Sequence, residues 1–191
     1  AYKAISIKST AGNLTTAALT STTADMLLNA SGSAVMGTLS AATGLTATSG
    51  SSMKLASFAV SNGTATVEAK GDYTQSGTGQ ASKAVSIKAT AGNLTTAALT
   101  STTADLLVNA SGSAVMGALT AATGVNATSG SSMKLASFAV SGGTGTFVAG
   151  TDYTLSGAGQ ANKAISIKAT AGNLITGALT STTADTLLNA G

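Results

Sequence analysis

The sequence contains no cysteine, proline, histidine or tryptophan, and it also lacks arginine. Without cysteine, neither disulfides nor thiolate metal sites can stabilise the chain. Without histidine, the commonest general acid–base group and metal ligand is missing. These absences exclude the disulfide-rich small folds and argue against catalysis.

Charge is scarce as well. Charged residues make up 8% of the 191 residues, and the formal net charge is +3. All nine positive charges are lysines that occur singly, so they form no basic stripe for nucleic acid. No apolar run approaches the roughly 18 to 20 residues that a membrane helix needs. We therefore expect neither a nucleic-acid partner nor a membrane span.

One segment occurs three times. It begins as KAISIK at Lys3, as KAVSIK at Lys83 and as KAISIK again at Lys163. The period is 80 residues, and residues 3–82 differ from residues 83–162 at 17 of these 80 positions. Self-similarity at a fixed spacing indicates a repeat architecture. We interpret residues 1–82 as repeat unit 1, residues 83–162 as repeat unit 2, and residues 163–191 as a partial third repeat that donates a strand or acts as a cap.

Small and hydroxyl-bearing residues dominate the composition. Alanine, threonine, serine and glycine account for 120 of the 191 residues, so bulky core side chains are few. The β-branched threonines suit a pleated surface. The composition and the period together predict a mainly β fold, with two tandem β-sandwich-like repeats of 80 residues that each contain one short helix.

Two local patterns place these elements in the repeat. Residues 3–8 alternate between apolar and polar side chains, which is typical of a half-buried strand. Residues 33–44, SAVMGTLSAATG, place Val35, Met36 and Leu39 at helical spacing between a serine N-cap and a terminal glycine. This second stretch predicts the short helix.

The dipeptide Asn62-Gly63 lies between two alternating segments and predicts a β-hairpin. Eight of the 17 differences between the units fall between residues 62 and 78, and several of them make unit 2 more apolar. We expect these variable positions to face outward, where apolar patches commonly mark contacts. Phe147, Val148 and Leu155 are therefore predicted to pack against a neighbouring unit or subunit.

The repeats also suggest a mode of assembly. If residues 3–30 are segment A and residues 31–82 are segment B, the chain has the order A-B-A-B-A. One unmatched A segment is the arrangement needed for head-to-tail strand addition, and such heterologous contacts build filaments. The strand residues expected at this assembly interface are Ile5, Ile7, Ile165 and Ile167. A plainer interpretation is that the third A segment caps unit 2 within its own chain, or that the chain is a window cut from a longer array.

The carboxylates provide no convincing catalytic pair. They are Asp25, Glu68, Asp72, Asp105, Asp152 and Asp185. Only Glu68 and Asp72 are close in sequence, and Glu68 becomes Val148 in unit 2. Calcium-binding and phosphate-binding loop motifs are missing. We expect no enzymatic activity, no cofactor, no metal and no small-molecule substrate.

Six N-x-[ST] sequons occur in the chain. Such sites accept N-linked glycans on exposed loops of secreted proteins. The possible glycosylation sites are Asn13, Asn29, Asn62, Asn93, Asn109 and Asn126.

A family resemblance is carried by residues 104–137, ADLLVNASGSAVMGALTAATGVNATSGSSMKLAS. This stretch resembles the short helix, turn and strand of the variable outer domains of bacterial flagellins and related surface-filament proteins. Residues 147–157, FVAGTDYTLSG, are similar to strands of repetitive bacterial adhesins and phage tail proteins. The resemblance implies an extracellular structural role and identifies no ligand.

These observations predict a structural subunit of an extracellular filament, sheath or surface layer, located outside the cell or on its surface. Its partner would be further copies of itself, joined head-to-tail by β-strand addition. The alternative function is an adhesin stalk or an ice-binding repeat module. Ice binding would need threonines that repeat at strand spacing on a flat face.

Overall fold

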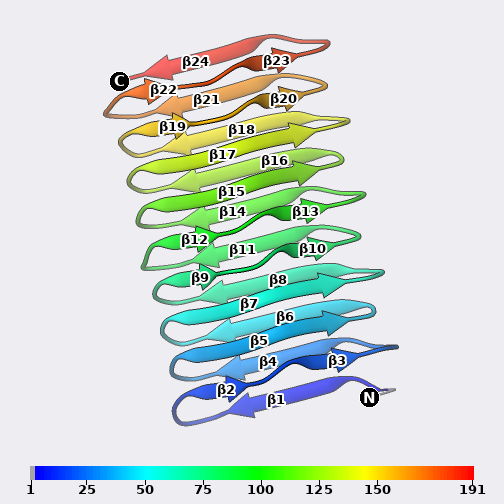
Figure 1. Ribbon diagram of the computed structural model, residues 1–191. Helices are drawn as coiled ribbons and strands as arrows, with labels where there is room; N and C mark the ends of the chain where they lie inside the picture. The colour runs from blue at the N-terminus through cyan, green and yellow to red at the C-terminus, as the bar shows by residue number, and fades with distance from the viewer. Residues whose placement is uncertain (1–2) are drawn as a thin grey trace.

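The computed structural model describes residues 3–191, and every regular element within this range is a β-strand. The chain winds into a parallel β-solenoid of about nine turns. Figure 1 shows the coils stacked from the N-terminal coil at the bottom to the C-terminal coil at the top. Each coil crosses one sheet and returns through the other, so the two sheets form two layers around one continuous core.

The first layer, which we call face A, is a sheet of ten strands, one for each passage of the chain. Inward and outward side chains alternate strictly along these strands, as in the buried-exposed pattern of β4. The strands are β1 (Ile5–Ser9), β4 (Met26–Ala30), β6 (Gly44–Ser49), β8 (Thr64–Ala69), β11 (Val85–Ala89), β14 (Leu106–Ala110), β16 (Gly124–Ser129), β18 (Thr144–Ala149), β21 (Ile165–Ala169) and β24 (Thr186–Ala190).

The second layer, face B, contains fourteen strands. Some coils cross it with one strand of eight residues, and the others with two short strands separated by a bend. The long strands are β5 (Ala34–Ala41), β7 (Met53–Val60), β15 (Ala114–Ala121) and β17 (Met133–Val140). The short strands are β2 (Leu14–Thr16), β3 (Leu19–Ser21), β9 (Tyr73–Gln75), β10 (Gly79–Ala81), β12 (Leu94–Thr96), β13 (Leu99–Ser101), β19 (Tyr153–Leu155), β20 (Gly159–Ala161), β22 (Leu174–Ile175) and β23 (Leu179–Ser181).

The 80-residue period corresponds to four coils. On face A, successive partners of Ile5 are Met26, Leu45, Ala65 and Val85, so the four coils are 21, 19, 20 and 20 residues long. Both sheets continue across the sequence boundaries of the repeat units: β8 pairs with β11 and β18 with β21 on face A, and β10 pairs with β13 and β20 with β23 on face B. The described part of each unit is therefore a stretch of one solenoid.

The predicted β-sandwich-like repeats with a short helix are wrong. The structure has no helix within residues 3–191, and its strand pairs are parallel, whereas sandwiches are built from antiparallel sheets. The strand predicted for residues 3–8 is confirmed as β1. The 80-residue period does not reveal the four coils within it, because each of the four has a different sequence.

The helix predicted for residues 33–44 is β5 and the start of β6. Val35 is half exposed on face B, whereas Met36 and Leu39 point into the core. Between these two, Gly37 and Thr38 both lie outside the buried set, so the alternation shifts by one position. This shift produces a three-residue spacing of apolar side chains, which mimics one side of a helix.

The hairpin predicted at Asn62-Gly63 is also wrong. These residues form a corner between β7 on face B and β8 on face A, and β8 pairs in parallel with β6 and β11. A two-residue type I′ hairpin needs positive φ at both central residues. Gly12 is the only residue with positive φ among residues 3–191. The glycine at position 63 has a different purpose: it lies directly over the backbone of Thr43 in the preceding coil.

The two repeat units fill their cores differently. In unit 1, the buried hydroxyl of Tyr73 donates a hydrogen bond of 2.8 Å to Oε1 of Gln75. Leu155 takes the place of this glutamine in unit 2, and the buried hydroxyl of Tyr153 has no partner within residues 3–191. Unit 2 has exchanged a polar pair for apolar packing.

An aromatic cluster accompanies this exchange. Phe147 replaces Val67 of unit 1, and its ring lies 4.5 Å from Phe138 and 6.0 Å from Tyr153 between centroids. Gly145, which replaces an alanine, makes room for it, because a Cβ there would lie 3.1 Å from both phenylalanine rings. The larger side chain is compensated by a smaller neighbour, as expected for a close-packed interior.

Replacing tyrosine with phenylalanine should affect the stability of the fold differently at positions 73 and 153. Tyr73→Phe should destabilise the fold by about 1 to 3 kcal/mol because it leaves the side-chain oxygen Oε1 of Gln75 buried and unpaired. Tyr153→Phe should be neutral or stabilising because it removes a hydroxyl that has no partner. Urea unfolding of the two variants measures the difference. Equal losses of stability would contradict the described hydrogen bonding.

Both tyrosines also predict a loss of stability at alkaline pH. Burial raises the pKa of Tyr73 and of Tyr153 far above the ordinary value of 10. Above pH 10 the unfolded chain releases these protons while the folded chain keeps them, so the free energy of unfolding falls as the pH rises. The slope is up to about 1.4 kcal/mol per pH unit for each tyrosine. Urea midpoints measured between pH 8 and 11 should fall less steeply for the double Tyr→Phe variant, and an unchanged slope would refute the assignment.

Candidate assembly surfaces

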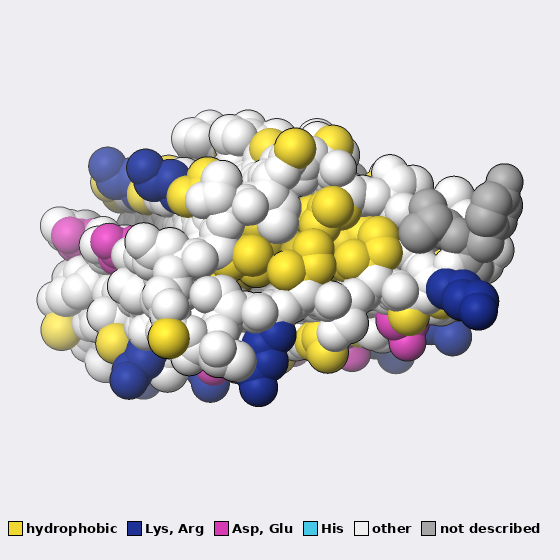
Figure 2. Space-filling model, turned by 90° about the horizontal axis from the view of Figure 1, so that it is seen from below, with side chains coloured by type: hydrophobic (Ala, Val, Ile, Leu, Met, Phe, Trp, Pro, Cys, Tyr) yellow, Lys and Arg dark blue, Asp and Glu magenta, His cyan; other side chains and the backbone are white. Residues whose placement is uncertain are grey.

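The N-terminal end of the solenoid is an open surface formed by β1, β2 and β3. Its inward residues, Ile5, Ile7, Leu14 and Leu19, pack against the core from one side and are only half buried. Figure 2 looks onto the molecule from this end and shows hydrophobic side chains at its centre, with lysines towards the periphery. The outer edge of β1 pairs with no strand of residues 3–191. This end therefore presents apolar side chains together with unpaired backbone groups.

The C-terminal end is open in the same way. Leu174 and Leu179 of β22 and β23 are half buried, and all five residues of β24 are exposed. Leu188 lies beside the buried Ile167 and points toward the core, yet its side chain remains 46% exposed. Thr186 occupies the position at which the preceding repeats have the buried Met26 and Leu106, so this inward position is more polar in β24.

The interior shows what these ends lack. Residues at the same inward position as Leu188, such as Leu28 and Val108, are fully buried because a coil lies on each side of them. An edge strand presents a row of free N–H and C=O groups that can template the addition of another strand. Each end is chemically suited to accept one more coil.

The structure separates the predicted interface residues into two groups. Ile5 and Ile7 lie at the open N-terminal end, whereas Ile165 and Ile167 are buried beneath β24. Of the four residues expected at the assembly interface, only the first pair lies at an open end of the sheet. Whether this end makes contacts with another subunit stays a prediction.

The residues attributed to the hairpin are placed differently from what was expected. Phe147 and Leu155 are buried in the core and cannot pack against a neighbouring subunit. Only Val148 lies on the surface, half buried on face A. The premise that variable positions face outward is wrong here, because the two units differ inside the core as well as outside it.

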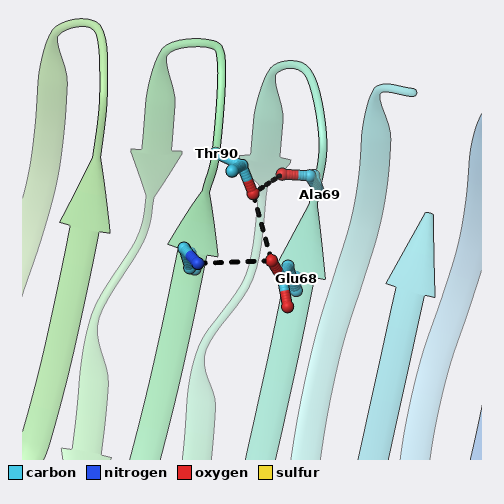
Figure 3. Close-up of polar contacts among 4 residues, drawn as sticks. Glu68, Ala69 and Thr90 are labelled. Carbon is cyan, nitrogen blue, oxygen red and sulfur yellow. Dashed lines mark hydrogen bonds and ion pairs between the residues drawn. The ribbon is translucent and has the colours of Figure 1, made fainter. Parts of the chain in front are cut away.

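Val148 occupies the place of Glu68, which joins a small polar cluster in unit 1. Oε1 of Glu68 accepts a hydrogen bond of 3.1 Å from the hydroxyl of Thr90 and lies 3.5 Å from Nζ of Lys88 (Figure 3). Both charged side chains are nearly half exposed, so this ion pair contributes little to stability. The structure therefore shows Glu68 in a surface contact with Thr90 and Lys88.

The aspartates hold corners together. Asp25 and Asp105 accept hydrogen bonds from the hydroxyls of threonines in the next coil, Thr43 and Thr123. Asp72 and Asp152 accept a hydrogen bond of 2.8 Å from the backbone N–H of Asn93 and Asn173. No group of three or more histidine, cysteine or acidic side chains within residues 3–191 could hold a metal ion.

The asparagines of the six sequons are all exposed, but only Asn13, Asn62 and Asn93 lie between strands; the other three, Asn29, Asn109 and Asn126, point outward from β4, β14 and β16. Two of them are also engaged in the fold: Oδ1 of Asn13 and of Asn93 accepts a 2.9 Å hydrogen bond from the backbone N–H of a serine in the next coil. Exposure makes glycosylation sterically feasible. The modification itself stays a prediction.

Sequence reasoning missed most of the residues that form the open ends. Leu14, Leu19, Leu174 and Leu179 belong to short strands that lie in the threonine-rich stretches of the first and third A segments. The usable signal was the five-residue spacing of the two leucines in LTTAALT. The same five-residue spacing recurs at Leu94 and Leu99 and at Leu174 and Leu179, and it fits two short strands separated by a bend better than one continuous strand.

Comparisons with protein-family models, with curated proteins and with solved structures found no significant match. The resemblance to flagellin outer domains therefore stays an expectation from the sequence, and the helix that it implied within residues 104–137 is absent. No helix within residues 3–191 is long and apolar enough to cross a membrane. The repetitive β-solenoid fits a structural or repeat module.

Proposed function

We propose that this chain is a structural subunit of an extracellular filament, sheath or surface layer, and that copies of it join head-to-tail by β-strand addition. The observation that carries the proposal is the pair of open ends, where half-buried core residues and unpaired strand edges lie together. Contacts between two different ends are heterologous, so they extend into a filament without closing. The assignment to the cell exterior rests on composition and resemblance alone.

The internal coil contacts support this mode of assembly. Each coil contributes one layer of side chains to a continuous core, and each is held to the next by parallel strand pairing on both faces. In repeat proteins of this kind, stability comes from nearest-neighbour interfaces between such layers. A second copy placed on an open end would add one more interface of a type that the chain already contains.

The outward columns of side chains do not favour ice binding. On face B, the column that begins at Thr15 continues with Val35, Lys54 and Thr74. On face A, the column that begins at Ser6 continues with a leucine before two threonines appear. Neither face carries the uninterrupted array of threonines that an ice-binding surface needs. An adhesin stalk remains the competing role, and it differs from a filament subunit by staying monomeric.

The deciding experiment is a concentration series followed by sedimentation velocity and negative-stain electron microscopy. A filament subunit should give rods that lengthen as the protein concentration rises, because each joint forms by mass action. Rods of constant length at every concentration would refute the filament proposal and favour a stalk. Regular rods without lateral bundles would further indicate that the ends, and not the faces, make the contact.

A further inference from the structure

We infer that the contact between two successive copies, which we call the joint, has a defined register and polarity. In this register, β24 of one copy pairs with β1 of the next, so that Leu188 lies beside Ile7. In this polarity, the cationic N-terminal end of one copy meets the anionic C-terminal end of the other. This inference rests on the proposed head-to-tail assembly and specifies its interface. The partner is a second copy of this chain.

The register follows from columns that run through the whole solenoid. Every step along face A keeps inward residues beneath inward residues, from Ile7 to Leu28 to Ala47 and onward. Extending this rule past β24 places the next copy's Ile7 on Leu188. A slip of one residue would turn all the apolar side chains of the added strand outward, which strongly disfavours it.

The side-chain pairs at such a joint are already found inside the chain. In the pairing of β1 with β4, Ile7 lies beside Leu28, Ser6 beside Leu27, and Lys8 beside Asn29. The joint would bring the same residue types together, because β24 carries Leu187, Leu188 and Asn189 at these three positions. Only the order of the two strands along the axis is reversed.

Face B is complementary in the same register. The half-buried leucines at positions 174 and 179 would be covered by the next copy's Leu14 and Leu19, so that apolar side chains meet in both columns. Ser181 would meet Ser21 in the neighbouring inward column, where these serines pair with Ala161 and Ala41 inside the chain. The joint therefore buries no apolar side chain against a charged one.

Charge gives the joint its polarity. The first coil, residues 3–21, contains Lys3 and Lys8 and no acidic residue, whereas the last coil, residues 174–190, contains Asp185 and no lysine. Opposite charges at the two ends favour head-to-tail contact, and like charges disfavour a contact between two N-terminal ends. Lys3, Lys8 and Asp185 are all exposed to solvent, so salt should weaken the preference.

Cysteine cross-linking tests the register, and the absence of native cysteine makes the test clean. The double variant Ser6→Cys/Leu187→Cys has outward thiols that would be neighbours across the joint, although they lie at opposite ends of one copy. Mild oxidation should convert assembled protein into a ladder of disulfide-linked oligomers, because a disulfide forms only between cysteines whose Cα atoms lie within about 7 Å. The matched control Ser6→Cys/Asn189→Cys is offset by two residues and should cross-link much less.

Three outcomes are distinguishable in this experiment. A ladder from the first variant but not from the control supports the register. Filaments that give equal ladders with both variants, or a stronger ladder with the control, overturn the register while leaving assembly intact. An absence of filaments in the unmodified protein overturns the proposed function itself, and the inference with it.

A charge reversal tests the polarity. Asp185→Lys should weaken assembly by about three- to tenfold at low salt, since it places like charges at the joint. Glu68→Lys makes the same change of net charge in the middle of face A and should leave assembly unchanged. Equal effects of the two variants would show that net charge matters and that the ends do not recognise each other electrostatically.

Discussion

Replacing Gly63 with alanine should destabilise the protein by about 3 kcal/mol or more, which is a large fraction of the stability of an ordinary domain. Gly63 is buried at the corner between β7 and β8. A Cβ at this position would overlap the carbonyl oxygen of Thr43 in the preceding coil. Because the obstacle is backbone, no change of side-chain rotamer can relieve the clash.

The surrounding hydrogen bonds explain why the corner cannot simply open. Asn62 N–H donates to the carbonyl of Ala42 at 2.8 Å, and Lys83 N–H donates to the carbonyl of Gly63 at 3.0 Å. The glycine is thereby held between the coils that precede and follow it, and adjacent strands of a sheet are only about 4.8 Å apart. Moving it away from Thr43 would strain both neighbouring coils.

The chain supplies matched controls for this prediction. Gly143 is the equivalent residue of unit 2 and meets the carbonyl oxygen of Thr123 in the same way, so Gly143→Ala should have a similar effect. Gly142→Asn introduces the residue that unit 1 has at the equivalent position 62, and it should change stability by less than about 0.5 kcal/mol. Urea midpoints for the three variants measure the contrast. A Gly63→Ala protein as stable as the Gly142→Asn protein would refute the close contact between coils.

Part of the fold could be predicted from sequence because face A follows a simple rule. Ile5 and Ile7 alternate with polar residues, and the strand that they indicate is confirmed as β1. The scarcity of bulky residues also correctly indicated a sheet-rich protein. Both signals are local, and neither depends on how the coils are arranged.

The solenoid itself was hidden because its coils do not resemble one another. The inward column that runs through Ile7, Leu28, Ala47 and Val67 uses four different residue types, and only the fifth member, Ile87, repeats the first. The coils also differ in length by up to two residues, which blurs a 20-residue period. What the sequence displays is the four-coil period, and that period has the size of a small domain.

The core exchanges explain why the interface residues were misplaced. The change from Val67 to Phe147 adds volume, and the change from an alanine to Gly145 removes some of it nearby. Such compensation is possible only between side chains in contact, and contacts between coils cannot be recognised before the winding is known. Variation therefore indicated exposure at positions that are in fact buried.

Replacing Leu188 with lysine should abolish head-to-tail assembly while leaving the single chain folded. In an assembled joint, the side chain at position 188 would be covered by the next coil, and burying an unpaired ammonium group is very costly. In the single chain this residue is 46% exposed, so a lysine there can reach water. We expect rods to disappear in electron micrographs at concentrations that assemble the unmodified protein.

The neighbouring residue provides the control. Leu187 is 63% exposed and points outward from the same strand, so in the joint a lysine at this position stays in water beside Ser6 of the next copy. Leu187→Lys should still assemble, at most several-fold more weakly at low salt because of the added charge, and both variants should have similar thermal unfolding midpoints. Assembly by Leu188→Lys, or its loss in both variants, would contradict contact through the inward column.

The opposite end permits a test of stoichiometry. Ile7→Lys should block the N-terminal end as Leu188→Lys blocks the C-terminal end, with Ser6→Lys as its outward-facing control. Each blocked variant keeps one functional end, so neither forms chains alone. An equimolar mixture has one compatible pair of ends and should stop at dimers in sedimentation velocity. Long rods from this mixture would mean that assembly proceeds through the faces, whereas monomers alone would mean that the two ends do not recognise each other.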